Sequence, residues 1–353
     1  MKKILLGTTA LVLLSGAAAA QQVSTKSPFT VSLNGSMRYN FAIFDQDASG
    51  VNRESSIDSR ILLKAEAKAD NGLTYGYRAR LRSGANTGGN AGAVGIDQSA
   101  IYASGSWGAV YLGDDSDART QLEVLNPTVG IGQADQVGFL LAGNNSMYWS
   151  TEGNWSTKAT YMTPSFSGFQ AGVSYTPEND NDQTRSVAAP GAAAGDYADW
   201  FDIGAGYTGS FGAVGLKVGA GIGFGAVDRG VDTDDAWNWN LGAQVSYAGF
   251  TFGGFYWDDN NTASVNTGRG GDDRTSWGLG LTYATGPWGV GASFVRTNVD
   301  YAAGGDDTDQ VIGVGGAYQL APGLSLQGDI LHVDAQSNNN DGWGISLRTR
   351  VDF

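Results

Sequence analysis

The chain has 353 residues, of which 54 are glycine, one is histidine and none is cysteine. The lack of cysteine excludes disulfide frameworks and thiolate metal sites, and a single histidine excludes a multi-histidine metal centre. The formal net charge of −14 argues against nucleic acid as a partner, because binding to nucleic acid depends on cations that neutralise phosphate.

The first twenty residues are predicted to be a cleaved secretory signal peptide. Lys2 and Lys3 supply its positive charge, residues 4–14 form a short apolar core, and small residues end at Ala20, where we expect cleavage. The apolar run is too short for a membrane-spanning helix, although an uncleaved anchor is the alternative. The sequence thus predicts an exported protein with one domain over residues 21–353.

Apolar and polar residues alternate with a period of two from residue 29 to the C-terminus. In residues 213–225, for example, Leu216 and Val218 fall on one face and Lys217 on the other. This alternation predicts strands with one apolar and one polar face. Sixteen such strands are predicted, over residues 29–43, 57–69, 73–83, 97–105, 107–114, 155–163, 168–176, 199–209, 213–226, 235–248, 250–258, 274–285, 288–299, 309–320, 324–334 and 341–353.

The connectors between these strands alternate in length. Short turns, such as residues 70–72 and 248–249, alternate with long polar loops, such as residues 44–56 and 115–154. Aromatic residues gather beside the short turns, as in a membrane-interface girdle. A soluble β-sandwich is the alternative, but it does not need sixteen two-faced strands. The sequence therefore predicts an all-β protein, a 16-stranded antiparallel transmembrane β-barrel with short turns at one end and long loops at the other.

Several segments resemble the general trimeric porins of Gram-negative outer membranes. They are SIDSRILLKAEAKADNGLTYGYRARLRS (56–83), IDQSAIYASGSWGAVYLGDD (96–115) and ATYMTPSFSGFQAGVSYTPEND (159–180). The C-terminal Phe353 is similar to the family's outer-membrane assembly signal. The resemblance implies short periplasmic turns, long external loops and a third loop folded into the lumen. It also implies a homotrimer in the outer membrane, with outer-membrane lipids, lipopolysaccharide and the assembly machinery as partners.

The polar face of the first three strands carries a concentration of positive charge. Counted from the turn ends, Arg38, Arg60 and either Arg80 or Arg82 fall at similar heights. In a water-filled lumen such charges tune ion selectivity, whereas the alternative is a solvated face without that role. The predicted basic wall of the pore constriction comprises Arg38, Arg60, Lys64, Arg78, Arg80 and Arg82.

The longest connector, residues 115–154, is predicted to supply the opposing acids. A loop of roughly 40 residues in a compact domain is usually functional. If it folds into the lumen, as the resemblance implies, its acids face the basic wall and set up a transverse field; the alternative is an external loop with solvated acids. The predicted acids are Asp114, Asp115, Asp117, Glu123 and Asp135. Inward glycines over residues 215–223 and 313–317 are expected to leave the lumen open.

These features predict a general diffusion porin with passive, weakly charge-selective passage of small hydrophilic solutes and ions. The alternatives are a substrate-selective channel and a structural or adhesive barrel. An enzyme is not expected, because a hydrolase needs a serine–histidine pair and alternation places His332 on the outward face. No cofactor is expected, although the acidic external loops offer oxygen ligands for calcium. Small residues over 101–112 suggest a contact between protomers.

Overall fold

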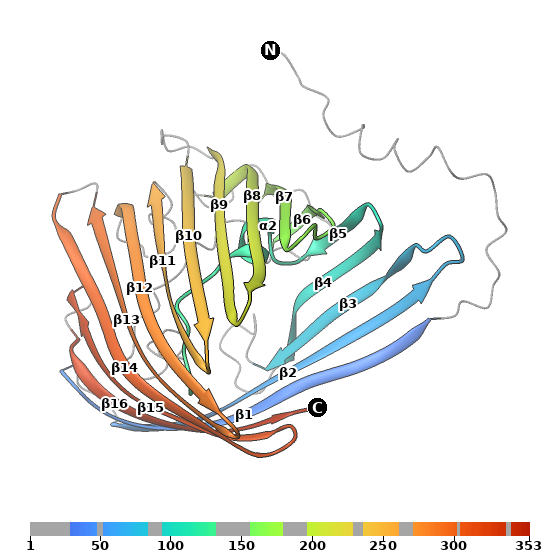
Figure 1. Ribbon diagram of the computed structural model, residues 1–353. Coiled ribbons are helices and arrows are strands. Elements are labelled where there is room, and N and C mark those ends of the chain that lie inside the picture. The colour runs from blue at the N-terminus through green and yellow to red at the C-terminus, as the bar shows by residue number, and fades with distance from the viewer. Residues whose placement is uncertain are drawn as a thin grey trace.

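Sixteen antiparallel strands close into a single barrel in the computed structural model (Figure 1). The structure describes residues 29–47, 52–83, 94–131, 156–178, 196–228, 236–260, 271–301, 304–336 and 340–353. Each strand pairs with its neighbours in the chain, and the first pairs with the last. The predicted fold is therefore confirmed, whereas the predicted signal peptide lies outside the described residues.

The strands follow the predicted ranges, with differences at their ends. Their bounds are β1 Thr30–Gln46, β2 Arg53–Lys68, β3 Thr74–Ser83, β4 Val94–Gly105, β5 Gly108–Asp114, β6 Thr157–Met162, β7 Phe169–Glu178, β8 Asp196–Phe211, β9 Val214–Asp228, β10 Ala236–Tyr247, β11 Phe250–Asn260, β12 Gly271–Thr285, β13 Trp288–Tyr301, β14 Asp306–Ala321, β15 Leu324–Ala335 and β16 Gly342–Asp352. For example, β8 is longer than predicted, because its ladder with β9 continues to the pair Phe211 and Val214.

The outer face of the barrel is apolar, as a membrane-spanning barrel requires. In β16, Trp343, Ile345 and Leu347 point outward and are more than half exposed, while Ser346 between them is fully buried inside. This arrangement reverses that of a soluble protein, because the surroundings of the outer face are lipid. No helix among the described residues is long and apolar enough to cross a membrane.

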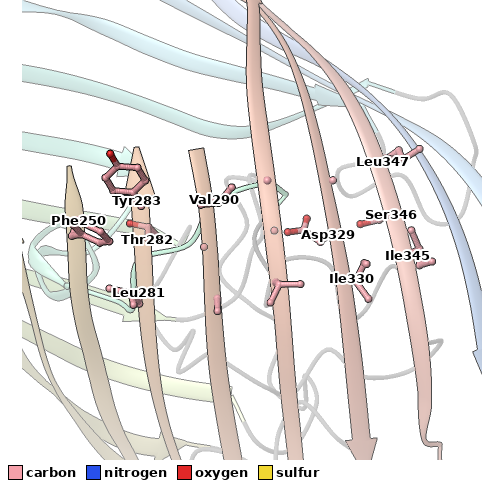
Figure 2. Close-up of a pocket in the computed structure, with 16 residues that line it drawn as sticks. Phe250, Leu281, Thr282, Tyr283, Val290, Asp329, Ile330, Ile345, Ser346 and Leu347 are labelled. Carbon is pink, nitrogen blue, oxygen red and sulfur yellow. The ribbon is translucent and has the colours of Figure 1, made fainter. Parts of the chain in front are cut away.

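A shallow hollow of about 750 Å³ lies against β11 to β16 (Figure 2). Outward side chains such as Leu281, Ile330 and Leu347 line it. Small outward positions, including Gly316 and Gly328, line the hollow between them. This part of the lipid-facing surface is therefore concave and apolar.

The short turns are built by residues that adopt positive φ. Between β10 and β11, Ala248 and Gly249 have φ of 49° and 85°, and the flanking Tyr247 and Phe250 pair directly. Positive φ at both central residues is the conformation of the two-residue hairpin turn that matches strand twist. Next to this turn, the rings of Phe250 and Tyr283 lie 4.5 Å apart. Aromatic contacts beside the turns fit the expected membrane-interface girdle.

The barrel also has an apolar cluster on its inner face. It comprises Ala42, Phe44, Phe255, Trp257, Val295, Val311, Leu331, Val333 and Ala335, all buried. Leu125, from the connector after β5, packs against this cluster. The single helix among the described residues, α2 (Ala118–Leu122), belongs to the same connector and contacts β7 and β8. The described part of the long connector, residues 115–131, therefore lies inside the barrel, and the rest of it lies outside the described residues.

Candidate pore constriction

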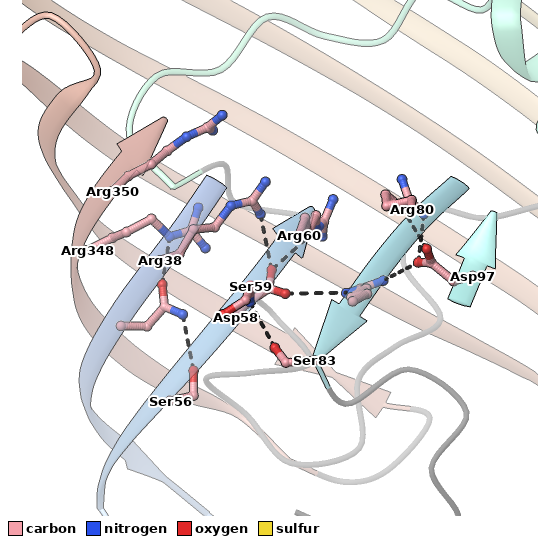
Figure 3. A network of polar contacts seen from close by, with 12 residues as sticks. Arg38, Ser56, Asp58, Ser59, Arg60, Arg80, Ser83, Asp97, Arg348 and Arg350 are labelled. Atoms are coloured by element: carbon pink, nitrogen blue, oxygen red, sulfur yellow. Dashed lines mark hydrogen bonds and ion pairs between the residues drawn. The ribbon is translucent and has the colours of Figure 1, made fainter. Parts of the chain in front are cut away.

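Three arginines from three neighbouring strands gather around one carboxylate on the inner wall (Figure 3). Asp58 of β2 lies 3.5 Å from Arg38 Nη1, 3.4 Å from Arg60 Nε and 3.7 Å from Arg82 Nε. The strand register explains the gathering, because Arg38 is directly opposite Asp58 and Arg60 is directly opposite Arg82. The structure thus brings Arg38, Arg60 and Arg82 together on one part of the inner wall.

Arg80 has a carboxylate partner of its own on the same wall. Its Nε and Nη2 donate to the two oxygens of Asp97, both at 2.7 Å, which is the strong bidentate geometry. Arg82 Nη1 lies 3.8 Å from the same carboxylate. A bulge in the β3–β4 ladder next to Arg80 allows Asp97 to turn inward. The charges are therefore linked along the wall from β1 to β4.

Two further arginines extend the wall across the closure of the barrel, and the sequence analysis missed them. Arg348 and Arg350 on β16 lie directly opposite Asn40 and Arg38 of β1 (Figure 3). Arg348 Nε donates to Asn40 Oδ1 at 2.6 Å, and Arg350 Nη2 lies 2.7 Å from Asp352 Oδ1. Their alternation with apolar neighbours could have placed them inward, but only the pairing of first and last strands places them beside Arg38.

The other predicted cations lie along the ladder between β2 and β3. Lys64 and Arg78 are directly opposite each other. Arg78 Nε donates to Asp115 Oδ2 at 2.9 Å, and its guanidinium lies 4.5 Å from the ring centre of Tyr111. Lys64 Nζ lies 2.6 Å from Glu66 Oε2. All six predicted basic residues thus fall on the inward face, and each of these two has an acidic partner.

The predicted loop acids do not act as one group. Asp115 reaches the basic wall through Arg78. Asp117 is buried and caps α2, with its Oδ1 accepting from Thr120 N at 2.7 Å. Asp114 differs from the prediction, because it lies on the outer face of the barrel. It is directly opposite Thr157, which is on the exposed face of β6, and its carboxylate accepts a hydrogen bond from the Thr157 hydroxyl. Asp135 lies outside the described residues.

Glu123 ends α2 and is half-buried. Burial, opposed by the nearby Arg119 and reinforced by Asp117, raises the pKa of its carboxyl to about 7. Much of the Glu123 population is therefore neutral near pH 7. Glu123 is consequently a weak source of negative charge for the channel.

Beyond α2, the connector runs along the inner wall past β9, β10, β12 and β14 to β15, which is the neighbour of β16. Hydrogen bonds fix it there: Gln244 Nε2 of β10 donates to the Leu125 carbonyl at 2.8 Å, and Ile131 N donates to Asp329 Oδ2 of β15 at 2.7 Å. The expectation that inward glycines leave the lumen open is therefore wrong at several positions. The connector lies directly on them; a methyl group on Gly219, for example, would be 2.2 Å from the Leu122 carbonyl oxygen.

A buried ion pair holds α2 to the wall. Arg119 Nε lies 3.2 Å from Asp202 Oδ1 of β8, and the two side chains are 1% and 0% exposed. On β6, Lys158 is also buried and donates to the carbonyl oxygen of Asp115. Ala118 N adds a hydrogen bond to Ser174 Oγ of β7 at 2.7 Å. The start of the connector is thus attached to three successive strands.

Other predicted features fall at the edges of the described structure. Among the described residues, no three side chains of the types that bind metals come together, and parts of the acidic loops lie outside them, so calcium binding stays a prediction. His332 packs its ring 4.6 Å from Trp343 on the outer face. Phe353 pairs with Gly35 through two main-chain hydrogen bonds. Its role as an assembly signal stays a prediction.

Comparisons with known proteins agree with this architecture. No curated protein sequence matches the chain. A porin structure refined at 1.8 Å resolution is 20% identical over 92% of this chain and 100% of its own, with a TM-score of 0.65. An anion-selective porin from Comamonas acidovorans is 19% identical with the same coverage and TM-score. The trimer form of OmpT from Vibrio cholerae is 12% identical over 92% of this chain and 99% of its own, with a TM-score of 0.63.

At these identities the solved structures establish the fold alone. The model of the Gram-negative porin family, however, matches residues 7–341, which is most of the chain. A closed barrel with an apolar outer face, a polar inner wall and an internal connector is the architecture expected of such a channel. The protein is a porin channel of the outer membrane, and the chain belongs to the Gram-negative porin family.

Proposed function

We propose that the protein is a general diffusion porin that passes small hydrophilic solutes and ions passively and prefers anions. The charge balance of the basic wall carries the proposal. The wall from β16 through β1 to β4 holds six arginines, namely Arg38, Arg60, Arg80, Arg82, Arg348 and Arg350, and the carboxylates that they contact are those of Asp58, Asp97 and Asp352. A net positive wall raises the local concentration of anions, even in a chain whose overall charge is negative.

The loop acids do not cancel this excess. Among those that the structure describes, Asp115 is paired with Arg78, Asp117 caps α2, and Glu123 is partly neutral. Screening in the water-filled lumen limits the preference, because the Debye length at 0.1 M salt is about 10 Å. The preference is therefore weak, as expected of a general rather than a substrate-selective channel.

Recordings in a planar lipid bilayer test this function. We expect stepwise increases in conductance as single channels insert, and a reversal potential across a salt gradient with the sign of anion preference. Conductance that saturates with one solute would instead favour a substrate-selective channel. The absence of conductance steps would favour a structural or adhesive barrel.

We also propose a homotrimer, in which the outer faces of β2 to β6 are the contact. Several polar groups on these faces are satisfied by each other rather than pointing into lipid. The hydroxyls of Tyr77 and Ser99 are 3.0 Å apart, and Ser59 N donates to Ser83 Oγ at 2.8 Å. Polar groups exposed to hydrocarbon are costly, so covering this side with another protomer is favourable.

Native mass spectrometry from a mild detergent tests the assembly. We expect the mass of three chains. Introducing a bulky charged residue at Ser99 on the contact face should release monomers, whereas the same substitution at Val314 on β14 should not. A wild-type protein that stays monomeric would contradict the proposed contact.

The remaining partners follow from the outer surface. The concave apolar hollow at β11 to β16 fits acyl chains of outer-membrane lipids (Figure 2). We propose that lipopolysaccharide meets the polar end of the barrel that bears the long loops, and that the assembly machinery recognises the C-terminal strand ending in Phe353. No enzymatic activity is proposed.

A further inference from the structure

The connector after β5 rests its main chain on glycines of five strands between β8 and β14. At five positions a methyl group built on the glycine would lie far inside contact distance of a connector carbonyl oxygen. These distances are 2.6 Å from Gly204 to Ala118 O, 2.2 Å from Gly219 to Leu122 O, 1.7 Å from Gly242 to Val124 O, 2.2 Å from Gly280 to Pro127 O and 2.2 Å from Gly315 to Val129 O. We call these five glycines, on β8, β9, β10, β12 and β14, the glycine seat.

Backbone conformation does not explain these glycines. None of the five has φ in the left-handed region that favours glycine. Each lies inside a strand, where glycine weakens the ladder and leaves nothing to pack. Close approach of another backbone is the remaining physical reason for glycine within a strand.

The hydrogen bonds of the connector keep it on the seat. The Gln244 bond to the Leu125 carbonyl lies next to Gly242, and the Ile131 bond to Asp329 lies next to Gly315. Leu125 packs on the inner apolar cluster between them. The described part of the connector, residues 115–131, is therefore held at Arg119, Leu125 and Ile131, and the seat determines how close to the wall it lies.

We propose that the five glycines of the seat are positioning residues that set the open width of the channel. Because they let the connector lie directly on the wall, the rest of the lumen, including the space beside the basic wall, stays open to passing solute. This proposal rests on the channel function proposed above. An alanine at Gly242 must move the Val124 carbonyl by roughly 1.5–2 Å to regain ordinary contact, and the wall leaves it only the direction of the lumen.

The test compares Gly242→Ala with Gly316→Ala. Gly316 lies on the outer face of β14, where an added methyl meets its nearest atom at 3.7 Å, an ordinary contact. Both substitutions change the entropy of the unfolded chain by the same amount, so any difference between the two variants measures the effect of the contact with the connector. We expect single-channel conductance to fall by roughly a fifth or more in Gly242→Ala, because conductance follows the open cross-section. Gly316→Ala should conduct as the wild type does.

A second pair on one strand repeats the comparison. In Gly315→Ala the methyl meets the Val129 carbonyl oxygen at 2.2 Å and the Asp329 carboxylate, which holds Ile131 of the connector, at 2.1 Å, whereas in Gly316→Ala it meets neither. Hydrogen–deuterium exchange over residues 118–131 supplies a readout that does not need conduction, and we expect faster exchange only in the seat variants. If the wild type forms no channel, the proposed function is wrong, but hydrogen–deuterium exchange over residues 118–131 still tests whether the five glycines position the connector.

The proposal is overturned if the Gly242 and Gly315 variants fold and match Gly316→Ala in both conductance and exchange. If Gly242→Ala does not fold, the milder variant Gly289→Ala takes its place in the test of the proposal. Its methyl would lie 3.1 Å from a Val129 side-chain atom, so it should lower conductance less than Gly315→Ala but more than Gly316→Ala. Equal conductance in all three would likewise overturn the proposal.

Discussion

Replacing Arg80 and Arg82 together with alanine is expected to shift the channel toward cations. Both guanidiniums lie on the basic wall, and their removal leaves the carboxylate of Asp97 without either of its cations. At about 7 Å in water, two unit charges change the energy of a passing ion by roughly 1 kcal/mol. That energy corresponds to about a five-fold change in local ion concentration. The reversal potential across a salt gradient should therefore move to the cation side.

The measurement is most sensitive at low ionic strength. At 0.01 M salt the Debye length is about 30 Å, so the wall charges act across the whole lumen. Folding should change little, because ion pairs in a wet environment are individually weak stabilisers. The shift should shrink as salt is raised. A shift that is the same at all salt concentrations would point to a change in pore shape instead.

A charge-neutral pair provides the matched control. Arg80→Ala with Asp97→Ala removes one cation and its bidentate partner, so the net charge of the wall stays the same. We expect a much smaller shift in reversal potential than in the double arginine variant. Asp115→Asn should move the potential the opposite way, because it releases Arg78. If none of these variants moves it, the basic wall does not control selectivity.

The basic wall was predictable from sequence because it depends on local alternation. Arg38, Arg60 and Arg82 alternate with apolar neighbours over three consecutive strands joined in order, so their height could be counted. Arg350 could not be placed beside Arg38, because they are neighbours only through the closure of the barrel.

The acids of the wall were missed for two different reasons. Asp58 has the same alternation as Arg60 and so belongs to the inner wall, whereas the predicted acids all come from the long connector and its start. Simple alternation from Ile101 puts Asp97 on the outer face, and the bulge next to Arg80 reverses it. Bulges carry no clear sequence signal, and each one changes the face of every residue beyond it.

The path of the connector was beyond sequence reasoning. A glycine on an inward face either leaves open space or allows another backbone to approach closely, and the local sequence around it is the same in both cases. The functions of the connector acids depend on that path. Asp117 became a helix cap because α2 starts there, and Asp115 became a partner of Arg78 because the connector leaves β5 beside β3 and β4.

Removing the guanidinium of Arg119 is expected to release the start of the connector from the wall. In Arg119→Met, the fully buried carboxylate of Asp202 loses the guanidinium that lies 3.2 Å from it, and the buried Asp117 loses a nearby positive charge. Removing one partner of a buried ion pair typically costs about 3–5 kcal/mol. That cost falls on α2 rather than on the barrel, because the strand ladders do not involve Arg119.

Hydrogen–deuterium exchange over α2 should therefore speed up in Arg119→Met, while the barrel stays folded. The double variant Arg119→Met with Asp202→Asn is the control, since it no longer leaves a charge buried at β8. We expect it to recover much of the wild-type exchange rate. If the double variant is as disturbed as the single one, packing of the long Arg119 side chain against Gly221, not its charge, holds the connector in place.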